Sequence, residues 1–256
     1  MTKAKILHKD ISSGNILIVG DAGILIDWEL CRRIDTETAR SYEKTVSLFT
    51  FSTIAWSDCL VYQGTYQFVS ARLLLNTTQE HVHNVGDDLE SFVHVLTWAA
   101  IKYASNELTP ANRSHHLKNF DSVQYAAFSK VEFFQRDMLA IESIGLKQQP
   151  LSAVLEAIYT GFGHRYGSLE HKKLKKLNQQ AAEAELEKLE THDWLYNTLR
   201  DALEDSEWKA ATDGRVNQEV LEDDKYLTNR QKNRKKSMIP EYEEELNSNA
   251  KRSRRG

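Results

Sequence analysis

The feature that most constrains the fold of this chain is a pair of short β-branched runs near its N-terminus. The runs I-L-I-V at residues 16–19 and G-I-L-I at residues 23–26 are separated by a short glycine-containing break. Such runs favour strands, and a break of this kind favours a tight turn, so the pattern predicts a β-hairpin. Asn15 directly precedes the first run and Asp27 directly follows the second. The hairpin should therefore return Asp27 towards Asn15.

A third polar residue, Asp10, lies upstream in the sequence H-K-D-I-S-S-G-N. A single Asp or Asn near a turn commonly satisfies backbone groups. Here the loop, the hairpin and Asp27 follow in one order, which favours a shared cleft holding Asp10, Asn15 and Asp27. Carboxylate and amide oxygens are suitable ligands for a hard cation such as Mg²⁺.

The order of these residues resembles the catalytic loop H-R-D-x-x-x-x-N of protein kinases and the metal-binding D-F-G that follows it. Further along, G-T-Y-Q-F-V-S-A-R-L-L at residues 64–74 is similar to the end of a kinase activation segment. D-D-L-E-S at residues 87–91 is similar to the start of the central helix in the C-terminal lobe. Together with L-I-D-W-E-L, these motifs resemble the fungal-type protein kinase family, over roughly residues 6–210.

The resemblance implies catalytic roles in the loop for His8, Lys9 and Asp10, with Asp10 orienting the attacking hydroxyl group. Asn15 and Asp27 would bind Mg²⁺ and, through it, ATP. Lys9 replaces the usual Arg and gives up the planar fork that pairs with a phosphorylated activation segment. We therefore do not expect regulation by such phosphorylation.

Four further positions follow from the resemblance. Ser12 lies where many kinases carry a Lys that contacts the transferred phosphate, so we assign it to the ATP site as well. Gly64 and Thr65 would belong to the activation segment and the platform for a protein substrate, and Asp88 would brace the catalytic loop. Arg72 occupies the position of an acidic residue that normally pairs with a later Arg, and the sequence suggests no partner for it.

We expect a mainly α fold with a small β-hairpin, that of a protein kinase-like C-terminal lobe over residues 1–211, followed by a disordered charged tail at 212–256. No glycine-rich loop and no V-A-I-K strand precedes His8. The sequence therefore predicts a C-terminal lobe that lacks the N-terminal lobe. Such a truncated chain should have little or no activity by itself.

Residues 46–63 are more apolar than a mobile surface loop should be. Their ends can be encoded by codons that resemble splice signals, so one interpretation is a retained intron. A genuine insertion that packs as a small strand or helix is the other, and both stay open.

Downstream, apolar periodicity predicts helices over residues 88–104, 123–139, 151–162 and 172–190. The polar stretch 106–119 is expected to be a loop. An apolar stripe that begins at Trp194 and ends at Trp208 should pack back on the lobe.

The net charge of −4 does not favour nucleic-acid binding. Two cysteines without metal spacing give no disulfide framework or zinc site. No leader or apolar run long enough to span a membrane is present in this sequence, so we expect a cytoplasmic or nuclear protein that does not associate with membranes. Basic clusters at 230–236 and 251–255 could serve nuclear import or be ordinary solvated charge.

Three functions compete. We favour a protein kinase that moves the γ-phosphate of ATP, with Mg²⁺, to a Ser or Thr hydroxyl of a protein substrate. A small-molecule phosphotransferase of the aminoglycoside or choline kinase type also carries H-x-D-x-x-x-x-N and I-D-W. A non-catalytic, pseudokinase-like interaction module is the third possibility. The motifs at residues 64–74 and 87–91 favour the first. The oligomeric state does not follow from the sequence.

Overall fold

The computed structural model describes residues 6–20, 22–34, 65–75, 82–121, 126–136 and 138–210. All of them belong to one compact unit, residues 1–219. Gly64, the stretch 46–63 and the tail expected from residue 212 lie outside the described residues.

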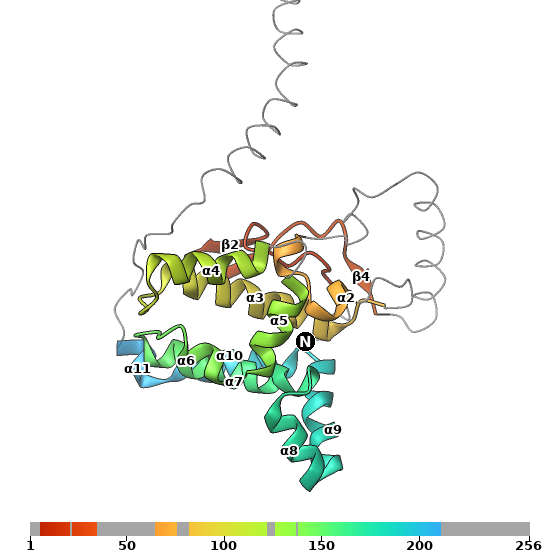
Figure 1. Ribbon diagram of the computed structural model, residues 1–256. Coiled ribbons are helices and arrows are strands. Elements are labelled where there is room, and N and C mark those ends of the chain that lie inside the picture. Colours follow the sequence, from red (N-terminus) through yellow and green to blue (C-terminus); the bar gives the residue numbers. More distant parts are fainter. Residues whose placement is uncertain are drawn as a thin grey trace, which may run out of the picture. The chain divides into compact units, whose positions relative to one another are not determined.

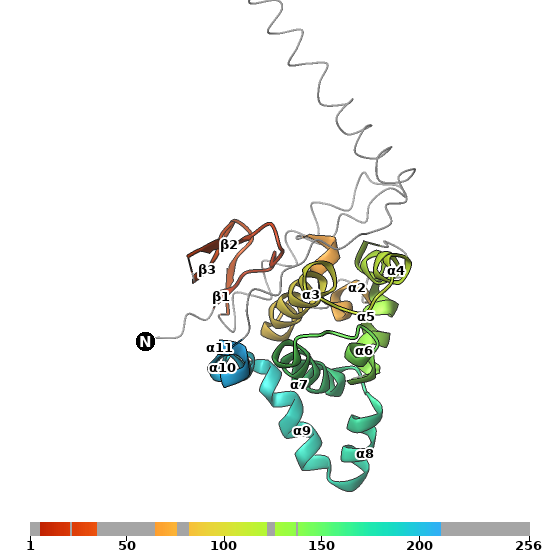
Figure 2. The same cartoon turned by 90° about the vertical axis from the view of Figure 1, so that its left-hand side faces the viewer.

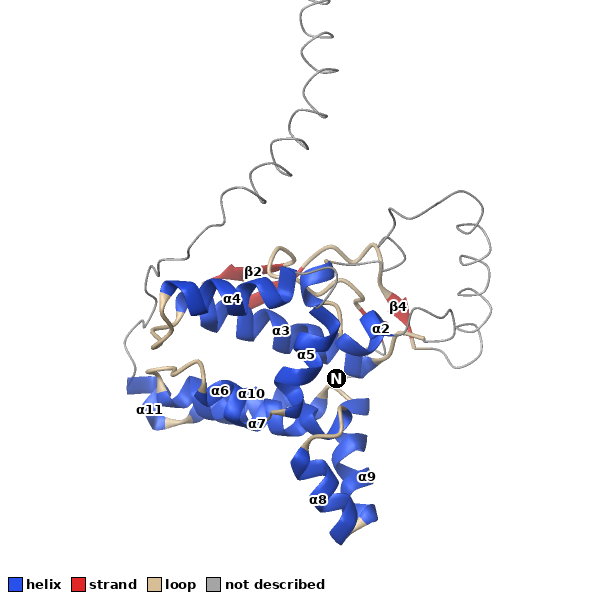
Figure 3. Cartoon of the chain, in the orientation of Figure 1, coloured by secondary structure: helices blue, strands red, loops and turns tan. Residues whose placement is uncertain are grey.

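Helices make up most of the described chain, and a small antiparallel sheet accompanies them (Figures 1 and 3). This confirms the expected mainly α composition with a β-hairpin. The strands are β1 (Ile6–Leu7), β2 (Ile16–Val19), β3 (Ala22–Leu25) and β4 (Arg32–Arg33). The helices are η1 (Tyr66–Phe68), α2 (Ala71–Leu75), α3 (Val85–Tyr103), α4 (Pro110–Asp121), α5 (Ala126–Gln135), α6 (Met138–Glu142), α7 (Gln149–Arg165), α8 (Leu169–Leu177), α9 (Gln179–Glu187), η2 (Lys188–Glu190), α10 (Asp193–Glu204) and α11 (Ser206–Ala210).

The predicted hairpin forms from β2 and β3, which pair antiparallel from Ile16 opposite Leu25 to Val19 opposite Ala22. Gly20 begins the connection with φ of 59°, a left-handed conformation that glycine adopts without a steric penalty. A second antiparallel pair joins β1 to β4. Figure 2 shows β1, β2 and β3 on one side of α3. The H-K-D motif begins at His8, directly after β1, and lies between β1 and the hairpin in the chain.

Helix α3 is the longest described helix, with 19 residues, and it begins in a capping box. The Asn84 side chain accepts a hydrogen bond from the Asp87 backbone N–H, and the Asp87 carboxylate accepts one from the Asn84 backbone N–H. Behind α3 the core is aromatic, because the ring of Phe134 on α5 stacks on Tyr159 and Phe162 of α7. These three rings are almost fully buried, so α3, α5 and α7 share one core.

The prediction of a loop at residues 106–119 was wrong, because α4 occupies Pro110–Asp121. Proline is favoured at the first position of a helix, and the Thr109 hydroxyl accepts the N–H of Asn112 in the manner of a helix cap. The polar composition hides a buried face that includes Arg113. The Arg113 guanidinium donates to the Leu108 carbonyl at 2.8 Å.

Two predicted helices are each divided in two. The stretch 123–139 contains α5 and the start of α6, and the stretch 172–190 contains most of α8 and all of α9. Asn178 separates α8 from α9, and its side chain caps α9 by accepting the N–H of Ala181. Figures 1 and 2 show α8 and α9 side by side as a helical hairpin.

The apolar stripe that begins at Trp194 packs back on the helical core, because α10 contacts α7. A Cβ atom built on Gly161 of α7 would lie 2.4 Å from the Trp194 ring, so only glycine leaves room for the indole. Leu195 is buried beside it. Among the described residues, no helix combines the length and apolarity needed to cross a membrane.

Candidate functional site

The backbone of the H-K-D loop is held by one carboxylate of α3. Asp88 accepts the N–H of His8 at 2.6 Å and the N–H of Lys9 at 3.0 Å. The His83 Nε2 lies 2.8 Å from the same carboxylate. Asp88 is 2% exposed, so these hydrogen bonds are shielded from water. Asp88, for which the resemblance implied a bracing role, thus contacts the backbone of the H-K-D loop at two N–H groups.

The Asp10 carboxylate is held from two sides. Its Oδ2 accepts the Asn15 side-chain N–H at 3.1 Å, and the Asn15 amide also donates to the Asp10 carbonyl at 2.8 Å. Its Oδ1 accepts the backbone N–H of Thr65 at 2.6 Å. A carboxylate oxygen has two lone pairs, so both oxygens can still accept another hydrogen bond. The backbone N–H of Thr65, the first described residue of the segment 65–75, therefore contacts the candidate catalytic carboxylate of Asp10.

The hairpin reaches the same loop through Ile26, the residue before Asp27. The N–H of Ile26 donates to the Asn15 carbonyl at 2.9 Å, and the Ile26 carbonyl lies 3.0 Å from His8 Nε2. Because a carbonyl only accepts, Nε2 carries the proton in this contact. The Trp28 indole packs edge-on against the His8 ring, with centroids 4.6 Å apart. These contacts fix the position at which the chain enters Asp27.

Lys9 and Asp27 share an unusual backbone conformation. Their φ angles are 70° and 63°, and they are the only described non-glycine residues with positive φ. Left-handed conformation costs such residues roughly 1–3 kcal/mol and is concentrated at functional sites. Both outliers lie at positions singled out by the motif, one on each side of the hairpin.

Magnesium fits the donors that Asn15 and Asp27 offer. Asn15 uses its N–H groups on Asp10, and within the described chain its Oδ1 accepts no hydrogen bond. The Asp27 side chain is exposed. An amide and a carboxylate oxygen suit an ion that completes its shell with phosphate oxygens and water. Ser12, in contrast, is 3% exposed, and its backbone carbonyl accepts the N–H of Asn15.

The structure supplies the partner that the sequence did not suggest for Arg72. The guanidinium of Arg72 forms an ion pair with Asp87, donating to both oxygens of that carboxylate. Arg165, at the end of α7, donates to the same Asp87 at 2.8 Å and to Glu90 at 3.1 Å. The acid that pairs with the late Arg is therefore provided by α3.

Glu90 is the second buried acid at this junction. Its carboxylate accepts the N–H of Ala71 at 2.6 Å and the hydroxyl of Tyr166 at 2.6 Å. The Nε2 atom of His94, one turn further along α3, lies 3.2 Å from the Glu90 carboxylate. Glu90 thus joins α2, α3 and the end of α7 in one hydrogen-bonded cluster.

The electrostatics of the cluster follow from burial and pairing. Burial alone would raise the pKa of Asp87, but the hydrogen bond from Arg72 and the charges of Arg165 and Arg72 outweigh it and lower that pKa to about 2. Burial, together with the charge of Lys130, lowers the pKa of His94 to about 4. Asp87 is consequently ionised and His94 neutral near pH 7.

Sequence reasoning missed Asp87, Glu90, Arg165 and Lys130 as parts of this site. The run D-D-L-E offered a signal for the acids, because carboxylates at the start of a helix are favoured by its dipole. The two cations carried no local signal, since each one reaches its partners from a helix distant in sequence.

In a comparison with protein families, the model described as fungal protein kinase matches residues 1–100 of the 256-residue chain. This region carries the H-K-D loop, the hairpin, Asp27 and most of α3, and the family indicates a protein of the protein kinase-like class. The match confirms the resemblance to fungal-type protein kinases that the motifs predicted. No curated protein and no solved structure matches the chain.

Proposed function

We propose that the chain is the catalytic-loop portion of an ATP-dependent protein kinase that transfers the γ-phosphate of ATP to a Ser or Thr hydroxyl of a protein. The observation that carries this proposal is the Asp10 carboxylate, oriented by Asn15 and Thr65 on a loop whose backbone Asp88 holds. Phosphoryl transfer depends mainly on such positioning and on charge neutralisation.

Each residue has a task in this proposal. Asp10 orients the substrate hydroxyl and accepts its proton. Asn15 and Asp27 provide the oxygen ligands for Mg²⁺, and Mg²⁺-ATP supplies the transferable phosphoryl group when bound. His8 positions both sides of the site, since its backbone N–H is held by Asp88 and its ring faces the carbonyl before Asp27.

A protein hydroxyl is favoured over a small-molecule hydroxyl by the segment 65–75. This segment begins on Asp10 at Thr65 and is anchored at Ala71 and Arg72 to acids of α3. A fixed stretch of backbone beside the Asp10 carboxylate offers a surface for an extended polypeptide.

The test measures transfer of labelled phosphate from Mg²⁺-ATP by the purified full chain to a mixture of Ser and Thr peptides, and separately to aminoglycosides and choline. Because the sequence predicts little activity for this chain by itself, we expect weak peptide phosphorylation that Asp10→Asn abolishes and that Asp201→Asn, an exposed change on α10, leaves intact. Titration calorimetry with Asp27→Asn checks nucleotide binding. A folded chain that neither binds Mg²⁺-ATP nor phosphorylates peptides would contradict the proposal and favour the interaction module.

A further inference from the structure

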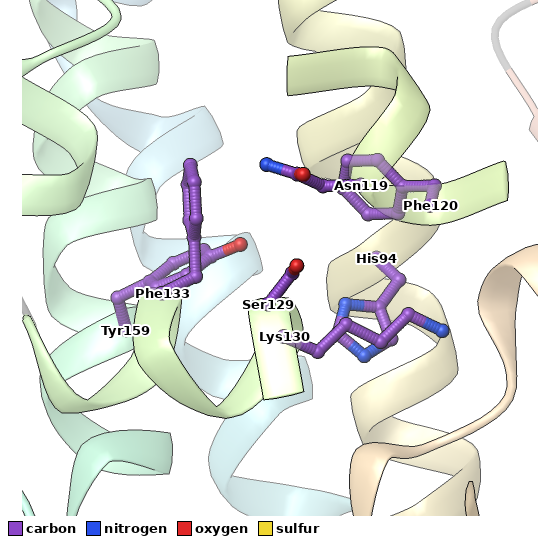
Figure 4. Close-up of a pocket in the computed structure, with 7 residues that line it drawn as sticks. All are labelled: His94, Asn119, Phe120, Ser129, Lys130, Phe133 and Tyr159. Atoms are coloured by element: carbon purple, nitrogen blue, oxygen red, sulfur yellow. The ribbon is translucent and has the colours of Figure 1, made fainter. Parts of the chain in front are cut away.

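Lys130 of α5 is a buried lysine to which the proposed chemistry gives no task. The residue is only 3% exposed, although lysine is almost never fully buried unless it is paired. Figure 4 shows the side chain passing beside the His94 imidazole, with its amine directed away from Asn119 and Tyr159. The amine therefore makes its contacts outside the small pocket that these residues line.

The amine of Lys130 binds the two ends of one short turn. Its Nζ donates to the Val69 carbonyl at 2.8 Å and reaches the Tyr66 carbonyl at 3.5 Å. Tyr66 is the first residue of η1 and Val69 is the residue that ends it. One side chain thus fixes both ends of this turn from below the surface.

The same turn places a hydrogen-bond donor on the Asp10 carboxylate. Within the turn, the N–H of Phe68 donates to the Thr65 carbonyl at 2.9 Å. Phe68 is 1% exposed and packs edge-on against Trp98. The Thr65 N–H, at the start of this turn, donates to Asp10. Because the turn is short and closed by its own hydrogen bond, the location of its ends determines that of the Thr65 N–H.

The surroundings of Lys130 explain why an amine is tolerated there. Burial opposes its charge and lowers its pKa to about 7, against the attraction of Glu90. Of the other ionisable groups that line the pocket, His94 is neutral near pH 7, and burial raises the pKa of the Tyr159 hydroxyl, which stays neutral as well. The Glu90 charge and the two carbonyl dipoles therefore compensate the amine.

We propose that Lys130 is a positioning residue for phosphotransfer: its amine fixes the turn of residues 65–69 so that the Thr65 N–H stays on the Asp10 carboxylate. The catalytic part of this role rests on the proposed function, whereas the structural part does not. Without the amine, the buried Val69 carbonyl and the half-buried Tyr66 carbonyl lose this donor, and Asp10 loses a rigid support on one side.

The test compares Lys130→Met, which keeps the apolar stem, with Lys130→Arg, which keeps donors and charge, in the full chain. Lys173→Met, at an exposed site on α8, is the matched control. In Lys130→Met we expect amides of residues 65–69 to exchange with deuterium about tenfold faster. We expect kcat to fall about tenfold or more with KM for ATP nearly unchanged, and Lys130→Arg to restore part of both losses.

Unchanged exchange at residues 65–69 in a folded Lys130→Met chain would overturn the proposal, as would a rise in KM for ATP with normal kcat. If the native chain transfers no phosphate, the proposed function fails, and the exchange measurement alone decides whether Lys130 holds the turn. Should Lys130→Met not fold, Lys130→Gln, which keeps a shorter N–H donor, is judged by the same criteria.

Discussion

Individual carboxylates in this protein hold backbone N–H groups of distant segments. Asp10 accepts from Thr65, Asp88 from His8 and Glu90 from Ala71. Hydrogen bonds to an ionised acceptor are stronger than neutral ones, and a buried donor that loses its acceptor is costly. Removing the charge of one such acid should therefore change both stability and the position of a functional segment.

Asp88→Asn should lower the free energy of unfolding by about 2 kcal/mol or more, because it replaces one of the two acceptor oxygens by an NH2 donor that faces a backbone N–H group. Urea denaturation followed by circular dichroism measures the effect. Asp201→Asn, at an exposed ion pair, should cost less than about 0.5 kcal/mol. Equal losses in the two variants would contradict the role of Asp88 as a brace.

Lys130 should make stability depend on alkaline pH. The unfolded lysine keeps its proton up to about pH 10.5, whereas the folded one loses it near pH 7. In this window the unfolded state binds more protons, so the native chain gains stability over Lys130→Met as the pH rises. Urea denaturation at about pH 6.5 and about pH 9 should show a gain of roughly 2 kcal/mol. A difference between the two chains that does not vary with pH would refute this.

His94 should make the stability of the protein depend on pH below neutrality. Its pKa is about 6.5 unfolded and about 4 folded, so stability is lost as the pH falls between these values. His94→Gln should remove most of this dependence, which thermal denaturation from about pH 7 to about pH 4 would reveal. An unchanged pH profile in the variant would show that another group is responsible.

The sequence predicted the local half of this site and missed the long-range half. Asn15, Asp27 and the hairpin follow from β-branched runs and a glycine turn, which act over a few residues. Arg165 and Glu90 meet across 75 residues of chain. Such a meeting depends on how α3 and α7 pack, and neither helix carries a signal for it.

At the scale of elements, the ion-paired cluster joins α2, α3 and the end of α7. Glu90 contacts Ala71, Tyr166 and Arg165, and Asp87 contacts Arg72 and Arg165. Buried ion pairs contribute little by themselves, but removing one partner leaves an uncompensated charge. The cluster should therefore behave as a unit.

Arg165→Met should cost about 3–5 kcal/mol, because Asp87 and Glu90 keep their charges without it. The substitution Glu90→Gln should lower the free energy of unfolding less when Arg165 is already Met than it does in the native chain. A double-mutant cycle by urea denaturation measures the coupling, expected at about 1 kcal/mol or more. Additive losses would show that the two residues act independently.

Gly161→Ala should detach α10 from α7, because the new Cβ would overlap the Trp194 ring. We expect a loss of about 1–3 kcal/mol and a shift in tryptophan fluorescence. Gly23→Ala, where a Cβ meets no atom within 4 Å, is the control. A native-like melting temperature in Gly161→Ala would contradict this packing.

The sequence was least informative about the bounds of the helices. Helix α4 was missed because its buried residues include Arg113 and Ser114, which periodicity does not count as apolar. The pair Thr109–Pro110 carried the missing signal, a cap followed by a first-turn proline. The break at Asn178 likewise depends on a side-chain cap rather than on hydrophobic pattern.

At the scale of the molecule, the family match and the folding unit have different extents. The match ends at residue 100, within α3, whereas the compact unit continues to residue 219. Val93 and Ile101 of α3 are at most 1% exposed, in a core shared with α5 and α7. The part that carries the motifs thus relies on the rest of the unit for its core.

A chain of residues 1–103 should consequently be unfolded, because α3 would expose its buried face to water. A chain of residues 1–219, which retains every described element, is the matched comparison and should unfold cooperatively. Circular dichroism and urea denaturation distinguish the two. A cooperative transition in the shorter chain would contradict this dependence.

The attachments of the segment 65–75 have a consequence for how it can change in evolution. Its contacts to Asp10, Lys130, Glu90 and Tyr166 use main-chain N–H and carbonyl groups, which almost any residue type supplies. The residues that hold it are on other elements. Related chains can therefore diversify the exposed side chains of this segment, and with them the surface presented to a binding partner, while the attachment is inherited unchanged.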